Sequence, residues 1–164
     1  MRWFLAAMLT ALTACTASPR LSYTPEDYLS SLRAVNQARA QARTCTTGGT
    51  PKAYSPAPAL TWNGLLGEVA RQRAEYIQQT GQFSHFEGSS STYAVATRSQ
   101  QVGYKYLEIR ENLARGYASA GVAVAAWLSS TDGHCNTIME PHLREMGMVR
   151  RGDYWVLVLA QPQP

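Results

Sequence analysis

Apolar and polar residues recur along this chain with two different periods, which separate predicted helices from predicted strands. A helical spacing is seen over 25–43, where Leu29, Leu32, Asn36 and Arg39 recur every three or four residues. Thr24 is a favourable N-cap for this helix, and Pro25 suits its first position. Similar spacing predicts three further helices, one over 63–80 that is capped by Thr61 or Asn63 and ended by Gly81, one over 92–101, and one over 119–128.

Three later segments have the short, apolar character of strands. They cover residues 106–114, 145–150 and 154–160, and the turn at 151–153 joins the last two into a predicted hairpin. Residues 44–60 contain three prolines and two glycines, so we expect a loop there. Helices that are followed by a mixture of helices and strands indicate an α+β domain, and 164 residues suit one such domain.

The amino terminus has the features of an export signal. Arg2 precedes an apolar run of about ten residues, which is too short to cross a bilayer as a helix. The sequence Leu-Thr-Ala-Cys at 12–15 looks like a bacterial lipobox, in which the cysteine is lipidated before cleavage. We therefore predict a signal peptide over 1–14, lipidation of Cys15 and a polar tether over 15–24. The alternative is an ordinary signal peptide that ends at a nearby small residue.

The cysteine count bears on this choice. There are three cysteines, and an odd number leaves a spare thiol in an oxidising compartment. Lipidation of Cys15 leaves Cys45 and Cys135 as a pair, for which we predict a disulfide. Loop-closure entropy gives such a bond a stabilisation of about 4 to 5 kcal/mol. Neither cysteine has the C-x-x-C spacing of a zinc site, although His134 is next to Cys135.

Charge excludes one class of partner. The net charge is +4, which is too weak to indicate a nucleic-acid-binding protein. The basic residues are scattered over the predicted helices, and we expect them to form solvated faces. They include Arg33, Arg39 and Arg43 on the first helix, and Arg71 and Arg73 on the second.

A series of short motifs runs through most of the chain. The clearest are Leu-x-x-Val-Asn-x-x-Arg at 32–39, Leu-x-Trp-Asn-x-x-Leu at 60–66, Phe-Ser-His at 83–85, Glu-Asn-Leu-Ala at 111–114, Trp-Leu-Ser-Ser at 127–130 and Gly-His-Cys-Asn at 133–136. In order and spacing they resemble bacterial domains of the CAP superfamily (cysteine-rich secretory, antigen 5 and pathogenesis-related proteins). The resemblance covers residues 29–160 and implies a CAP domain over 25–164. It also implies an α-β-α sandwich, in which a small antiparallel sheet lies between helices beneath a cleft.

The resemblance also implies site residues. The family has a histidine after the second helix and a glutamate in the Glu-Asn motif, which correspond to His85 and Glu111. Many members add a second glutamate and a second histidine, and the four hold a divalent metal. This chain has Ser130 at the second glutamate's position, and its last strand has no histidine. His134 is the candidate replacement, so the predicted ligands of Zn²⁺ or another divalent cation are His85, Glu111 and His134.

Two imidazoles and a carboxylate suit a zinc ion that keeps one position open for water. The candidates for a general base or a supporting carboxylate are Glu87, Glu108 and Asp132. The structural alternative is that His85 and Glu111 only hydrogen-bond each other and hold the loops in place. Asn112 follows Glu111 on the opposite face of the predicted strand, where we expect its amide to brace a loop.

Serine catalysis is a weaker hypothesis for this sequence. Ser129 and Ser130 precede His134 closely, but the chain has no Gly-x-Ser-x-Gly elbow, and closeness in sequence does not create a catalytic triad. We expect His142, which follows Pro141, to be a surface residue.

The sequence therefore predicts an exported, lipid-anchored monomer of the bacterial cell envelope, on the periplasmic or outer face. Its function would be that of a binding or interaction module for a protein, peptide, lipid or envelope polymer. The alternative is a metal-dependent hydrolase of peptides or envelope polymers, because one fold hosts many functions.

Overall fold

The computed structural model describes residues 25–164, with side chains from Tyr28 onward. The predicted signal peptide, Cys15 and the tether lie outside the described residues, so their assignments stay predictions. Within the described part, no helix is long and apolar enough to cross a membrane.

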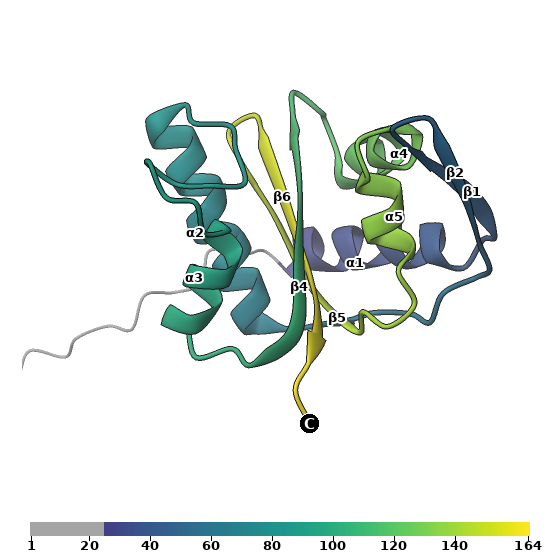
Figure 1. Ribbon diagram of the computed structural model, residues 1–164. Helices are drawn as coiled ribbons and strands as arrows, with labels where there is room; N and C mark the ends of the chain where they lie inside the picture. Colours follow the sequence, from purple (N-terminus) through teal and green to yellow (C-terminus); the bar gives the residue numbers. More distant parts are fainter. Residues whose placement is uncertain (1–24) are drawn as a thin grey trace, which may run out of the picture.

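A four-stranded sheet forms the centre of the domain, with the strand order β3-β5-β6-β4 (Figure 1). The predicted hairpin is confirmed as β5 (Glu145–Arg151) and β6 (Tyr154–Pro162), which pair in antiparallel fashion. The short β3 (Thr61–Trp62) runs parallel to β5 at one edge, and β4 (Tyr106–Arg115) is antiparallel to β6 at the other. In the part of the chain that the structure describes, β4 therefore has a partner strand on one side only.

Helices cover both faces of this sheet. On one face, α2 (Gly64–Thr80) and α3 (Ala94–Gln101) pack against β5, β6 and β4. On the other face lie α1 (Pro25–Arg39), α4 (Ala120–Ser129) and α5 (His134–Met139) (Figure 1). The predicted α+β class and the α-β-α sandwich are both confirmed.

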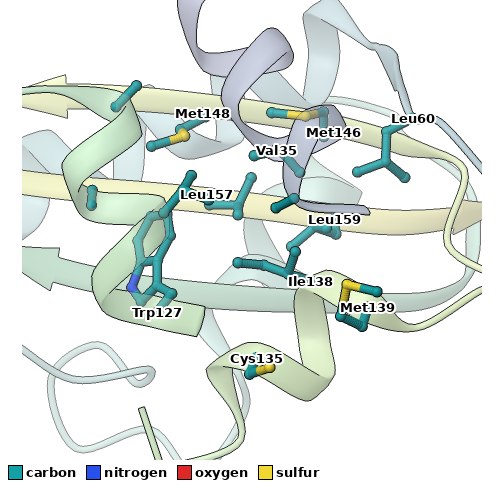
Figure 2. Packing of buried hydrophobic residues seen from close by; sticks show 14 of the residues in the cluster. Val35, Leu60, Trp127, Cys135, Ile138, Met139, Met146, Met148, Leu157 and Leu159 are labelled. Carbon is teal, nitrogen blue, oxygen red and sulfur yellow. The ribbon is translucent and has the colours of Figure 1, made fainter. Parts of the chain in front are cut away.

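The alternation of side chains along β6 serves two cores. Leu157 and Leu159 point toward α1, α4 and α5, where they pack with Val35, Trp127 and Ile138 (Figure 2). Val156 and Val158, which alternate with these leucines along the strand, join the core beneath α2. All four positions are fully buried, as expected for a strand covered on both faces.

The approach of α2 to β5 depends on a glycine. A Cβ atom on Gly147 would lie 2.2 Å from the backbone nitrogen of Gly67 and 2.3 Å from the carbonyl carbon of Leu66. These are backbone atoms of α2, so they cannot rotate away as a side chain would. Asn63 fixes the start of the same helix as its N-cap, because its side-chain oxygen accepts from the N–H groups of Leu65 and Leu66.

The predicted disulfide is confirmed. Cys45 and Cys135 are bonded, with their Cα atoms 5.5 Å apart and both residues buried. Cys45 lies in β1 (Arg43–Thr47), which forms a two-stranded antiparallel sheet with β2 (Thr50–Tyr54). The bond therefore attaches this small sheet to α5.

Three details of the sequence prediction are wrong. Residues 44–60 are not a continuous loop, because the β-branched residues of β1 and the glycine pair at its end form a hairpin. The first helix ends at Arg39 rather than Arg43, and the strand β1 begins at Arg43. The helix α5 was not predicted, because six residues are too few to show a helical period.

Candidate functional site

The centre of the candidate site is a chain of three charged or polar side chains that crosses from β4 to α2. The ring of His85, which follows α2, places Nδ1 2.8 Å from Oε2 of Glu111 on β4. The other oxygen of Glu111 accepts a hydrogen bond from Nε of Arg73 at 2.8 Å. The side chains of Glu111 and Arg73 are completely buried, whereas the side chain of His85 is 34% exposed.

Burial sets a condition on the two charged members of this group, Arg73 and Glu111. A carboxylate and a guanidinium that are removed from water must be paired, and here they pair with each other. Burial alone would lower the pKa of Arg73, but the charge of Glu111 and hydrogen bonds to Glu111 and Glu87 outweigh it and hold that pKa above its ordinary value. When Glu111 is ionised, it accepts the Nδ1–H of His85, which leaves the Nε2 atom of a neutral ring without its proton.

A second carboxylate supports Arg73 from outside. Oε1 of Glu87 accepts from Arg73 at 2.7 Å and from Nε of Arg98, on α3, at 2.7 Å. Arg73 also donates to the carbonyl of Ser84, one residue before His85. Burial raises the pKa of Glu87, but hydrogen bonds from Arg98 and Arg73 outweigh burial and hold it below the ordinary value. The connection that carries His85 is thus attached to both α2 and α3.

The second histidine comes from the opposite wall. His134 is the first residue of α5, and its Nδ1 lies 2.8 Å from the hydroxyl of Ser130. The side-chain amide of Asn112, which we expected to brace a loop, donates to the backbone carbonyl of His134 at 3.1 Å. Burial lowers the pKa of His134, the charge of Asp132 partly opposes that effect, and the charge of His85 reinforces it. His134 is therefore predominantly neutral at neutral pH.

His85, Glu111 and His134 border one cleft with a volume of about 530 Å³, which we call the β4 cleft. The residues that line the β4 cleft are Thr47, His85, Tyr93, Glu108, Ile109, Arg110, Glu111, Asn112, Asp132, Gly133, His134, Asn136 and Thr137. A smaller hollow of about 340 Å³ shares Asp132 and His134 with it and continues past Leu113 to Arg115. A separate cavity of about 420 Å³, beside Ser119 and Trp155, has no histidine or carboxylate in its lining.

The contacts distinguish the predicted metal ligands from one another. Glu111 already serves Arg73 and His85, so a metal bond would compete with a buried ion pair. The Nδ1 atoms of His85 and His134 both have partners, and no described residue hydrogen-bonds either Nε2 atom. A ring whose second nitrogen is held by a carboxylate or hydroxyl matches the usual surroundings of a metal-binding histidine. Among residues 25–164, no group of three histidine, cysteine or carboxylate side chains is placed to hold a metal ion. Metal binding stays a prediction, for which the two imidazoles are the better ligands.

The other candidate carboxylates lie in two places. Glu87 belongs to the buried network, whereas Glu108 and Asp132 line the β4 cleft. Burial raises the pKa of Glu108, but hydrogen bonds from Arg110 and His142 outweigh it and hold that pKa below the ordinary value. His142 is half-exposed, and its Nε2 lies 2.7 Å from Oε2 of Glu108.

Ser130 contacts His134 directly, as the serine hypothesis requires, whereas Ser129 bonds backbone carbonyls of its own helix. The Ser130 hydroxyl also accepts the N–H of Asp132 at 3.1 Å. It therefore joins the turn before α5 to the ring of His134. This contact pattern fits an orienting residue.

Sequence reasoning missed Arg73 as a site residue, and the expected solvated faces are wrong for two arginines. Arg73 and Arg39 are both completely buried. Arg39 donates to the backbone carbonyls of Pro58, Ile138 and Leu143, and burial lowers its pKa to about 10. A signal was present, because Arg73 shares the buried side of α2 with residues such as Val69 and Ile77. A charged residue on an apolar helix face predicts a buried partner.

The chain resembles known proteins in sequence and in fold. The sequence model of the cysteine-rich secretory protein family, named CAP, matches residues 32–157. A search of curated proteins finds no match.

Three solved structures have a similar fold. A cysteine-rich secretory protein from Staphylococcus aureus has a TM-score of 0.63 and 17% identity, over 86% of this chain and 40% of that protein. An extracellular protein with an SCP domain from Bacillus anthracis has a TM-score of 0.58 and 20% identity, over 64% and 34%. An outer surface protein from Borrelia burgdorferi has a TM-score of 0.55 and 20% identity, over 65% and 80%. The chain thus spans well under half of the first two proteins.

Proposed function

The chain belongs to the cysteine-rich secretory protein (CAP) family, and on that basis we propose that it is an exported, lipid-anchored binding module of the bacterial envelope whose ligand site is the β4 cleft. The observation that carries this proposal is the buried Arg73–Glu111 pair, which holds His85 at the wall of a cleft of about 530 Å³. A volume of this size falls in the usual range of ligand pockets.

Export and anchoring rest on the amino-terminal sequence and on the described cysteines. Cys45 and Cys135 are bonded to each other, which suits an oxidising compartment and leaves Cys15 as the remaining cysteine. The related proteins known as extracellular in Bacillus anthracis and as outer surface in Borrelia burgdorferi are consistent with the same location.

The proposal includes a divalent cation in the β4 cleft. The Nε2 atoms of His85 and His134 are its ligands, while Glu111 and Ser130 orient the two rings through Nδ1. Bound Zn²⁺ would supply a Lewis acid that attracts a carboxylate or carbonyl oxygen of a ligand. The low pKa of His134 favours this role, since only the neutral ring can bind a metal.

The hydrolase alternative requires a carboxylate that can take a proton from water. Glu87 and Glu108 are both paired with arginines that hold their pKa values low, which makes them weak bases. Glu111 is occupied by Arg73 and His85. Asp132 is the remaining carboxylate of the β4 cleft. Because it lies near His134, it is the candidate general base that the hydrolase alternative requires.

Elemental analysis of the purified protein tests the metal part of the proposal. We expect zinc to accompany the unaltered protein and His142→Ala, and to be lost from His85→Ala and His134→Ala. Equal zinc in all four proteins would contradict the assignment. Cleavage of a mixed peptide pool by the zinc-loaded protein, abolished in Asp132→Asn, would favour the hydrolase.

A further inference from the structure

The floor of the β4 cleft is the unpaired edge of a strand. β4 is the last strand in the order β3-β5-β6-β4, and within residues 25–164 it pairs only with β6. Residues 108–112 of β4 line the β4 cleft, and residues 113–115 line the smaller hollow that continues from it. The two hollows together therefore follow β4 for most of its length. In Figure 1, α3 and α5 lie on opposite sides of this strand.

The register shows which backbone groups face these hollows. The carbonyl of Ala160 on β6 accepts from the N–H of Arg144, on the β5 side of the strand. Ile109 on β4 is opposite Ala160. Because the backbone groups of Ala160 face β5, the two residues form a non-hydrogen-bonded pair, in which the N–H and C=O of Ile109 point away from β6. Because directions alternate along a strand, the backbone groups of Ile109, Glu111 and Leu113 all point to the open edge.

One side-chain contact supports this alternation independently. The indole N–H of Trp127 donates to the carbonyl of Leu113 at 2.9 Å, which places that carbonyl on the open side. No described residue hydrogen-bonds the backbone N–H or C=O of Ile109 and Glu111 on that side. Two donors and two acceptors are thus available at the spacing of alternate strand residues.

The exposed fraction of Glu111 indicates that main-chain atoms form the floor of the β4 cleft. Glu111 is 6% exposed as a residue, although its side chain is 0% exposed, so its accessible surface belongs to main-chain atoms. The walls rise on both sides, with His85 and Tyr93 from one layer of the sandwich and Asp132 and His134 from the other. An edge that lies between two such walls favours a single extended chain over the sheet of a second folded copy.

We propose that the ligand of the β4 cleft is an extended peptide that adds as a further strand along the open edge of β4. Its backbone would pair with Ile109 and Glu111, and its alternate side chains would face the two walls. Tyr93 is 51% exposed and stacks on the ring of His85, so it offers an aromatic surface to side chains on one wall. This inference rests on the proposed function, because it names the ligand class of the same cleft.

Short linear peptides from a random phage-displayed library are the probe. They are selected on the purified full chain, and Thr137→Trp, which fills the β4 cleft, should bind them at least about tenfold more weakly. The matched control is Val122→Trp, at an exposed position on α4 outside both hollows. A peptide that binds both variants equally is not a ligand of the cleft.

Amide hydrogen exchange then decides the mode of binding. In the free protein, the amides of Arg110 and Asn112 should be protected by β6, whereas those of Ile109 and Glu111 should exchange quickly. A bound peptide should slow the exchange of Ile109 and Glu111 by at least about tenfold. Methylation of alternate peptide nitrogens should abolish binding, and methylation of the nitrogens between them should not.

Two results would overturn strand addition. One is a selected peptide that leaves the exchange of Ile109 and Glu111 unchanged, and the other is a library that yields no peptide specific for the cleft. If zinc binding by His85 and His134 persists in either case, the proposed function stands and only the peptide inference fails. If zinc binding and peptide binding are both absent, the proposed function fails as well.

Discussion

Arg73 and Glu111 form an ion pair in which both side chains are completely buried, with Nε and Oε1 2.8 Å apart. The two residues lie 38 positions apart in the sequence, on α2 and β4, and they join the helical layer to the edge of the sheet. Through the second oxygen of Glu111 the same pair positions His85. The stability of the fold and the geometry of the β4 cleft therefore depend on one contact.

Removal of one partner should be costly. Arg73→Met leaves Glu111 buried without its main counter-charge, so we expect the free energy of unfolding to fall by about 3 to 5 kcal/mol. Arg71→Met, two residues away, is the control, because Arg71 is 25% exposed and should change stability by no more than about 1 kcal/mol. Urea denaturation measures both. Similar losses for the two variants would mean that the buried pair has no special weight.

The close contact between α2 and β5 should tolerate no side chain at Gly147. Gly147→Ala places a methyl group against the backbone of Gly67 and should cost about 3 kcal/mol or more in unfolding free energy. Gly121→Ala is the matched control, since a Cβ there meets no atom within 4 Å and alanine favours a helix. A thermal melt in which both variants match the unaltered protein would disprove the contact.

Much of this arrangement was predictable from sequence, and the rest was not, for identifiable reasons. The helical period of α2, the hairpin of β5 and β6 and the pairing of Cys45 with Cys135 follow from local pattern and from cysteine number. From the sequence, the apolar neighbours of Arg73 on its helix predict only that this arginine is buried. Its partner could not be predicted, because that depends on where the fold places β4 relative to α2. The open edge of β4 is a property of strand order, which no local pattern encodes.

Stability should depend on the charge of His134. Its pKa is below 6.5 in the folded protein, mainly through burial, so the unfolded chain binds a proton more readily as the pH falls through about 6.5. The contribution to stability is complete above that pH, decreases below it, and levels off below the folded-state pKa. Denaturation at a series of pH values should show this decrease, and His134→Gln should reduce it. An NMR titration with a His134 pKa above 6.5 would refute the explanation.

The anchor is predicted from residues outside the described structure. Cys15 should carry acyl chains, each buried methylene of which adds about 0.8 kcal/mol to membrane binding. Cys15→Ser should release the protein from the membrane fraction or prevent its processing. Mass spectrometry of the mature amino terminus is the check, and an unmodified terminus at another residue would rule out lipidation.

The most direct test of the β4 cleft as a binding site follows the imidazole nitrogens during a Zn²⁺ titration. The protein has three histidines, so ¹⁵N spectra of the side chains resolve two candidate ligands and one internal control. The Nε2 signals of His85 and His134 should shift together at the same Zn²⁺ ratio. Their Nδ1 signals should keep the signature of hydrogen bonds to Glu111 and Ser130. The signals of His142 should not change. A response confined to His142, or none at His85 and His134, would contradict the proposed site.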